Sequence, residues 1–97
     1  MNYIEALQDA VQKAHGCEAK HIQSVPVKEV FRGQTIWDGT VEVFSLTGHQ
    51  KATRCYAWGH HADDKSRDFR IVTALGLPPV DSPIAAVRVS VAGAAKE

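Results

Sequence analysis

Several features that usually direct the interpretation of a sequence are scarce or missing here. The chain of 97 residues has only two cysteines, Cys17 and Cys55, too few for a disulfide framework, and we expect both to be free thiols. Its N-terminus lacks a basic leader, and no apolar run reaches the length of a signal-peptide core or a membrane span. We therefore expect a cytoplasmic protein without a membrane partner.

An excess of charge of either sign is also missing, because eleven Lys and Arg residues balance eleven Asp and Glu residues. Such a chain has no strong field to draw it onto a phosphate backbone. The signature runs of RNA-recognition motifs are absent, and the last predicted helix lacks the lysine-rich start of double-stranded RNA-binding domains. Nucleic acid therefore ranks low among the partners we expect.

Motifs for catalysis and cofactor binding are absent too. The sequence has no glycine-flanked serine elbow, no phosphate-binding glycine loop and no motif that ties Cys55 to a histidine base. We therefore predict no cofactor and no catalytic residue. Enzymatic activity stays open but is disfavoured.

What the chain does contain is the composition of one folded domain. Hydrophobic residues make up 44% and charged residues 23%, which is typical of globular proteins. A chain of this length can form a core without metals or disulfides, and no repeat or linker divides it. We expect a single α+β domain over residues 1–97.

The N-terminal segment has the periodicity of an amphipathic helix. Its apolar residues recur at helical spacing: Ile4, Leu7, Val11 and Ala14. Asn2 can cap the start together with Glu5, and Gly16 can end the helix in the left-handed conformation.

The C-terminal segment allows two interpretations. Ser82 followed by Pro83 is a typical helix start, and the alanines that follow favour a helix. The alternation of Val87, Val89 and Val91 would also suit a strand. We expect a helix and keep a strand over residues 84–95 as the alternative.

Four strand-like segments lie between these helices: residues 21–31, 35–48, 51–60 and 69–77. Pro26 should place the first of them at an edge of the sheet or break it near its start, and Asp38-Gly39 either bulges the second or splits it. Short turns imply antiparallel neighbours. We therefore predict a two-layer α+β sandwich, with both helices over one face of a four-stranded antiparallel sheet.

Residues 52–60 alternate between small and large side chains. Cys55 and Ala57 share the small face, which suits a closely packed helix, so we expect Cys55 to be buried and inert. The large face carries Arg54, Tyr56, Trp58 and His60. If no bulge shifts the register, the face is extended by alternate residues of the neighbouring strands: Glu42, Phe44, Leu46, Ile71, Thr73 and Leu75.

An open aromatic face of this kind is unusual for a soluble monomer. We predict a non-enzymatic homodimeric binding or interaction protein, with a protein partner or small ligand as further possibilities. The predicted contact surface or adjoining pocket consists of Trp37, Arg54, Tyr56, Trp58 and His60. The plainer alternative is an ordinary amphipathic face that Arg54 and Glu42 shield.

Two other functions are weaker alternatives. A metal- or thiol-dependent enzyme would use His60 and His61 with Cys55 or Asp63, but "HHADD" matches no established ligand spacing. A second group, His15, Cys17 and His21 with a distant His49, lacks such spacing as well, so we predict no metal site. Single-stranded nucleic acid could instead stack on the aromatic face.

Three runs of the sequence, "HIQSVPVKEVF" with the following "GQTIWDGTVEVFSLTGH", "KATRCYAW" and "LGLPPVDSPIAAVR", resemble a family of short uncharacterised bacterial proteins. Some members of that family are carried as integron gene cassettes. The resemblance covers most of the chain and implies a small, cytoplasmic, stand-alone protein, of a kind that is often dimeric. It implies no activity, substrate or site residue.

Overall fold

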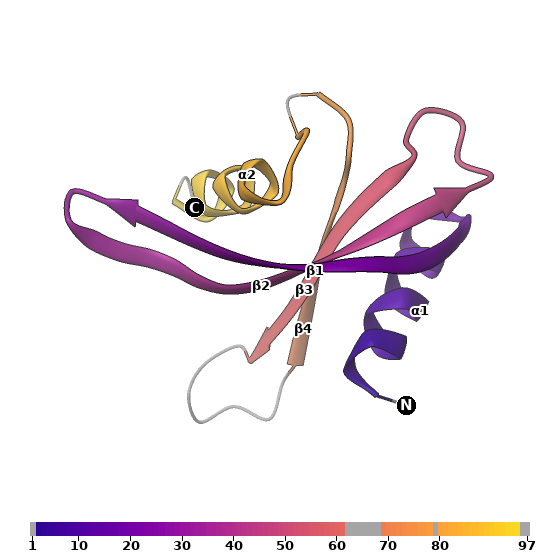
Figure 1. Ribbon diagram of the computed structural model, residues 1–97, viewed down its shortest axis with the longest axis horizontal. Helices are drawn as coiled ribbons and strands as arrows, with labels where there is room; N and C mark the ends of the chain where they lie inside the picture. The colour runs from indigo at the N-terminus through magenta and orange to yellow at the C-terminus, as the bar shows by residue number, and fades with distance from the viewer. Residues whose placement is uncertain (1, 62–68, 79, 96–97) are drawn as a thin grey trace.

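The computed structural model describes residues 2–61, 69–78 and 80–95 (Figure 1). The elements are α1 (Tyr3–His15), β1 (Glu18–Phe31), β2 (Gln34–Thr47), β3 (Arg54–His61), β4 (Phe69–Leu75) and α2 (Pro83–Ala95). The strands form one antiparallel sheet in the order β1-β2-β3-β4. The predicted α+β class, element order and four-stranded sheet are confirmed. No helix among these described residues is long and apolar enough to span a membrane.

Both helices begin as the sequence predicts. The Asn2 side chain accepts the Glu5 backbone N–H at 2.8 Å and donates to the Glu5 carboxylate at 3.1 Å, which closes a reciprocal cap. Gly16 ends α1 with φ of 63°. At α2 the Ser82 hydroxyl accepts the Ala85 N–H at 3.2 Å, so the helical interpretation of this segment is confirmed.

The β1–β2 hairpin extends well beyond the rest of the sheet. Its turn is formed by Arg32 and Gly33, both at positive φ, and β2 continues through the Asp38-Gly39 pair without a break. Only residues 42–45 of β2 pair with β3, so the outer half of the hairpin is a two-stranded ribbon. β1 is an edge strand, which confirms the position expected from Pro26.

A bulge at Ile22 changes which face of the sheet β1 contributes to. The pairing of β1 with β2 shifts between His21 and Gln23. Ala19, before the bulge, packs with α1, whereas Val27, after it, packs with α2. One strand therefore supplies core residues to both faces.

The two helices cover opposite faces of the sheet (Figure 1). α1 packs Leu7 and Val11 against the small face of β3, where Cys55 and Ala57 are fully buried. α2 packs against the other face, which carries Tyr56 and Trp58. Each helix packs on the sheet with a core of its own. The expectation that both helices lie over one face is wrong. The β1–β2 ribbon and the β3–β4 pair diverge, which leaves a separate surface for each helix.

The predicted register between β2 and β3 is also wrong. Glu42 pairs with Ala57, and Phe44 pairs with Cys55, so these β2 residues lie on the α1 side and not beside Trp58. The same holds in β4, where Leu75 pairs with Cys55. A register difference of one residue is enough to move a whole set of side chains to the opposite face.

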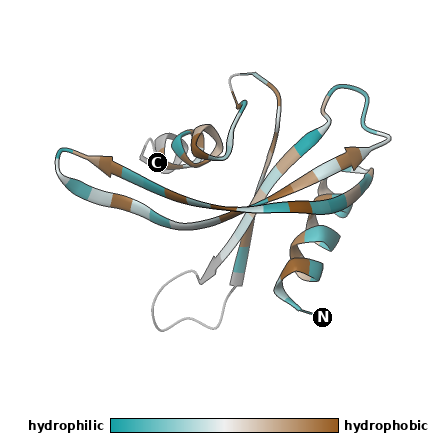
Figure 2. Cartoon of the chain, viewed as in Figure 1, coloured by the Kyte–Doolittle hydropathy of each residue, from teal (hydrophilic) through white to brown (hydrophobic). Residues whose placement is uncertain are grey.

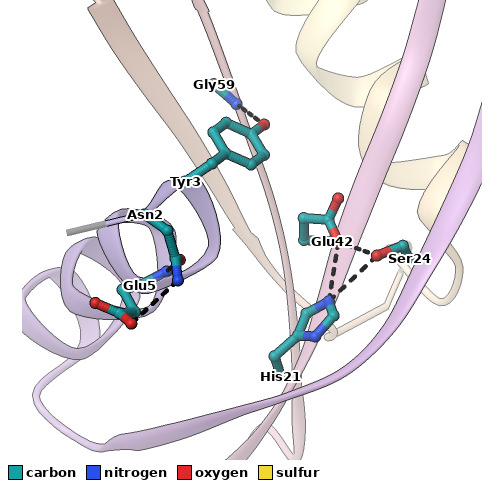
Figure 3. Close-up of polar contacts among 7 residues, drawn as sticks. All are labelled: Asn2, Tyr3, Glu5, His21, Ser24, Glu42 and Gly59. Atoms are coloured by element: carbon teal, nitrogen blue, oxygen red, sulfur yellow. Dashed lines mark hydrogen bonds and ion pairs between the residues drawn. The ribbon is translucent and has the colours of Figure 1, made fainter.

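The Tyr3 hydroxyl of α1 serves as a hydrogen-bond acceptor for β3 beyond the end of its pairing with β2. The described β2–β3 pairing ends at Ala57, and the next backbone N–H on that side, at Gly59, donates to the Tyr3 hydroxyl at 2.9 Å. The contact ties the start of α1 to β3 (Figure 3).

Candidate functional site

The predicted aromatic surface is a buried layer between β3 and α2. Tyr56 is 6% exposed and Trp58 is 4% exposed, and both pack in one cluster with Val87 of α2. The prediction that this face is open is therefore wrong. The physical reason is that α2 crosses to the aromatic side, where it buries more apolar area than it would over the face that α1 already covers.

Trp37 belongs to the same cluster although it comes from the outer hairpin. Its ring meets the Trp58 ring edge-on, with the ring centroids 5.6 Å apart. The Trp37 ring lies over Gly39, where an added Cβ would come within 3.1 Å of it. Gly39 is thus required for close approach of the indole, and the pair links β2 to β3 beyond the end of their hydrogen-bonded ladder.

Of the two remaining predicted site residues, Arg54 lies outside this cluster. Arg54 is exposed at the start of β3, and its guanidinium donates to the Thr53 carbonyl. Burial raises the pKa of Tyr56, which the positive charge of Arg54 opposes and the negative charges of Asp81 and Cys55 reinforce. His60 pairs with Arg70 through the backbone of β4, and the structure does not describe its side chain.

A polar cluster that the sequence interpretation missed lies on the α1 side of the sheet, at the bulge of β1 (Figure 3). Glu42 is 4% exposed and is the buried charged residue of the described chain. His21 Nε2 lies 2.9 Å from Glu42 Oε1, and the Ser24 hydroxyl donates to the same oxygen. The available signal was an acid on the otherwise apolar face of Phe44 and Leu46, which requires a partner.

The geometry of this cluster differs from a nucleophilic triad. In a triad, one ring nitrogen of the histidine faces the acid and the other faces the hydroxyl. Here the same Nε2 atom of His21 faces Glu42 at 2.9 Å and the Ser24 hydroxyl at 3.4 Å. No proton path runs from the hydroxyl through the ring to the carboxylate, so the arrangement serves to satisfy a buried carboxylate.

Two of the five histidines approach each other at the end of α1. His15 and His49 line a hollow of about 320 Å³ together with Gly16, Gly48, Gln50 and Lys51. His15 Nε2 lies 3.1 Å from the Thr73 hydroxyl, and burial followed by the charge of His49 lowers the His15 pKa. His49 accepts the backbone N–H groups of Lys51 and Ala52 at Nδ1.

The histidines near Cys17 that could have served as metal ligands have separate partners. His15 contacts Thr73, and His21 contacts Glu42. Within residues 2–61, 69–78 and 80–95, no three His, Cys, Asp or Glu side chains converge as metal ligands would. The alternative site at His60 and His61 included Asp63, which lies outside the described residues.

The two cysteines are free, and Cys55 is fully buried against α1 as predicted. Burial raises the pKa of the Cys55 thiol to about 11, with a backbone hydrogen bond at Ala74 opposing this shift and Cys17 adding to it. A thiol with such a pKa carries almost no thiolate at neutral pH, so it is a poor nucleophile.

Comparison of the chain with protein-family models, with curated proteins and with solved structures finds no match.

Proposed function

We propose that the chain is a non-enzymatic homodimeric interaction protein whose second copy covers the end of the β1–β2 hairpin and the outer side of α2. We call this region the hairpin–α2 surface and define it by Val30, Phe31, Ile36 and Val89. The observation that carries the proposal is the exposure of these apolar side chains, which ranges from 42% to 59%. Exposed apolar residues gathered in one region are typical of protein contacts.

The hairpin end lies beside α2, and its exposed apolar side chains point to both sides of the ribbon. Arg88 of α2 binds Glu29 of β1 at 2.9 Å, close to the hairpin turn (Figure 1). Phe31, two residues after Glu29 on β1, points to the α2 side like Glu29, whereas Val30 between them points to the other side. Figure 2 shows apolar residues alternating with polar ones along both hairpin strands.

The composition of α2 supports a partner on its outer side. Apart from Arg88, its sequence is Pro, Ala, Gly, Ser and branched apolar residues, and Val89 is 49% exposed. A helix that is apolar all round is normally buried all round. Among the described side chains of α2, the sheet covers the side where Ala86 and Val87 are buried and leaves Val89 exposed.

The charges beside this surface favour a second copy of the chain as its partner. Arg88 is held by Glu29, and the Arg32 guanidinium lies over the Phe31 ring at 5.2 Å from its centroid. A two-fold symmetric contact places the residues close to the axis beside their own copies, which apolar groups tolerate better than free like charges do. The family resemblance, which implies small and often dimeric proteins, supports the same proposal.

Sedimentation over a range of concentrations tests the proposal. We expect the wild type to dimerise reversibly, and Phe31→Ser or Val89→Ser to weaken dimerisation by roughly ten-fold or more. Ile22→Ser is the matched control, because Ile22 is also 44% exposed but lies at the bulge, away from the hairpin end. A monomeric wild type, or an equal effect of Ile22→Ser, would contradict the proposal.

A further inference from the structure

The two edges of the sheet differ in their protection against strand addition. β1 carries Pro26 and the bulge at Ile22, and both features interrupt pairing along an edge. β4 has neither, because it contains no proline and pairs with β3 in one continuous register. Among the described residues, no strand pairs with the outer edge of β4.

The backbone groups that β4 presents on this edge follow from its hydrogen bonds with β3. Gly76 N–H donates to the Arg54 carbonyl at 2.8 Å, so Arg54 and Gly76 form a hydrogen-bonded pair. By alternation, Ala74 and Val72 also bond to β3, while the N–H and C=O groups of Ile71 and Thr73 point to the outer edge. This row of groups can pair with an added strand.

The charges at the two ends of this edge have the same sign. Arg70 lies on β4 at one end, and Arg54 lies on β3 beside Gly76 at the other, one strand in from the edge and on the same face of the sheet. Both arginines are exposed, and neither forms an ion pair with a described residue. An added strand with acidic residues at its ends would complement them.

A second copy of β4 fits this edge less well. Antiparallel pairing of two β4 strands about Thr73 would place Arg70 of one chain opposite Gly76 of the other, next to the other chain's Arg54. Arg70 and the other chain's Arg54 would then lie on either side of Gly76, and their like charges would oppose the contact. The charge pattern therefore favours a different chain.

We propose that the outer edge of β4 binds an extended segment of a partner protein as an added antiparallel or parallel strand, and that this segment carries acidic residues near its ends. Main-chain hydrogen bonds to Ile71 and Thr73 supply the pairing, and the arginines select the charge. This inference goes beyond the proposed dimer and does not depend on it, because β4 contributes no residue to the hairpin–α2 surface.

The probe for this site is the synthetic peptide acetyl-Glu-Thr-Val-Thr-Val-Thr-Glu-amide, titrated into isotopically labelled protein and followed by NMR. We expect saturable shifts at the amides of Ile71 and Thr73, with β1 amides unchanged. The same peptide with Lys in place of both Glu residues should bind roughly five-fold more weakly. The titration is repeated with Phe31→Ser, where binding should persist even if dimerisation is lost.

The matched variants are Thr73→Pro and Thr73→Val. Proline removes the outward N–H at a position where an edge strand tolerates it, and should weaken peptide binding by about ten-fold or more. Valine keeps the N–H and loses only the hydroxyl contact with His15, so binding should stay near that of the wild type. If Thr73→Pro does not fold, N-methylated peptides replace the two variants. Methylation of the peptide N–H groups that face β4 takes the place of proline, and methylation of those that face away from β4 takes the place of valine.

Three results would overturn the inference. One is the absence of saturable shifts at Ile71 and Thr73, and another is equal binding of the Glu and Lys peptides. The third is a wild-type dimer that Thr73→Pro abolishes and Thr73→Val preserves, because a second copy would then occupy the edge.

Discussion

His21 and Glu42 face each other across β1 and β2, with 2.9 Å between the ring Nε2 and the carboxylate Oε1, at the point where β1 shifts its register (Figure 3). The bulge at Ile22 reverses the alternation of β1, so Ala19 and His21 before it lie on the α1 side, whereas Val25 and Val27 after it lie on the α2 side. This contact therefore lies where β1 passes from the core under α1 to the core under α2.

Removal of the Glu42 carboxylate should destabilise the fold. We expect Glu42→Ala to lower the free energy of unfolding by about 1–3 kcal/mol, because the contacts of His21 and Ser24 with this buried carboxylate are lost. Glu42→Gln keeps one acceptor oxygen and should cost less. Urea denaturation at neutral pH measures both changes.

The control for this prediction is Glu29→Ala, which removes the ion pair between Glu29 and Arg88. The Arg88 partner of Glu29 is 61% exposed, so that pair should contribute no more than about 1 kcal/mol. If Glu42→Ala costs no more than Glu29→Ala, the buried cluster does not stabilise the bulge.

Local signals in the sequence were sufficient for the elements and their order. The Asn2 cap, the Gly16 stop and the Ser82-Pro83 start each act within a few residues, and all are present in the structure. The edge position of Pro26 follows from its missing N–H, which depends on no other part of the chain.

The layer arrangement and the site depend on contacts that local patterns do not encode. The pairing of Phe44 with Cys55 is set by the connection between β2 and β3, and a shift of one residue reverses the faces. The bulge at Ile22 has no proline or glycine to mark it. Burial of Trp58 depends on which face of the sheet α2 covers, and the alternation of residues 52–60 does not determine that face.

Alkaline pH should reveal the burial of Cys55. Its thiol has a pKa of about 11 in the fold against a usual value near 9, so the unfolded chain loses this proton first as the pH rises. The contribution of the Cys55 thiol to the free energy of unfolding is fully present below about pH 9. It falls as the pH rises through the folded pKa, by about 2–3 kcal/mol in total. The raised pKa of Tyr56 adds a loss in the same direction at higher pH.

Urea denaturation at about pH 8 and again between about pH 10 and 11 measures this slope. Cys55→Ala should flatten it, and Cys17→Ala, which removes only a partly exposed thiol, should leave most of it unchanged. A slope that is identical in the wild type and Cys55→Ala would show that the buried thiol does not titrate as the fold implies.

The histidine pair at the end of α1 should respond to acid. Burial, followed by the charge of His49, lowers the His15 pKa from its usual 6.5, so the unfolded chain binds this proton more readily than the folded one. The contribution of His15 to stability is therefore present above about pH 6.5 and is lost as the pH falls through the folded pKa. His49→Asn should raise the His15 pKa partway toward its usual value, because the positive neighbour is removed while burial remains.

An NMR titration of the His15 ring protons measures this shift directly. Asn at position 49 keeps a side-chain oxygen that can accept the Lys51 and Ala52 N–H groups, so the turn should persist and the change can be assigned to charge. Thr73→Val is the control, because it removes the hydroxyl partner of His15 and leaves His49 in place. If Thr73→Val moves the His15 pKa and His49→Asn does not, the hydrogen bond and not the second histidine controls this proton.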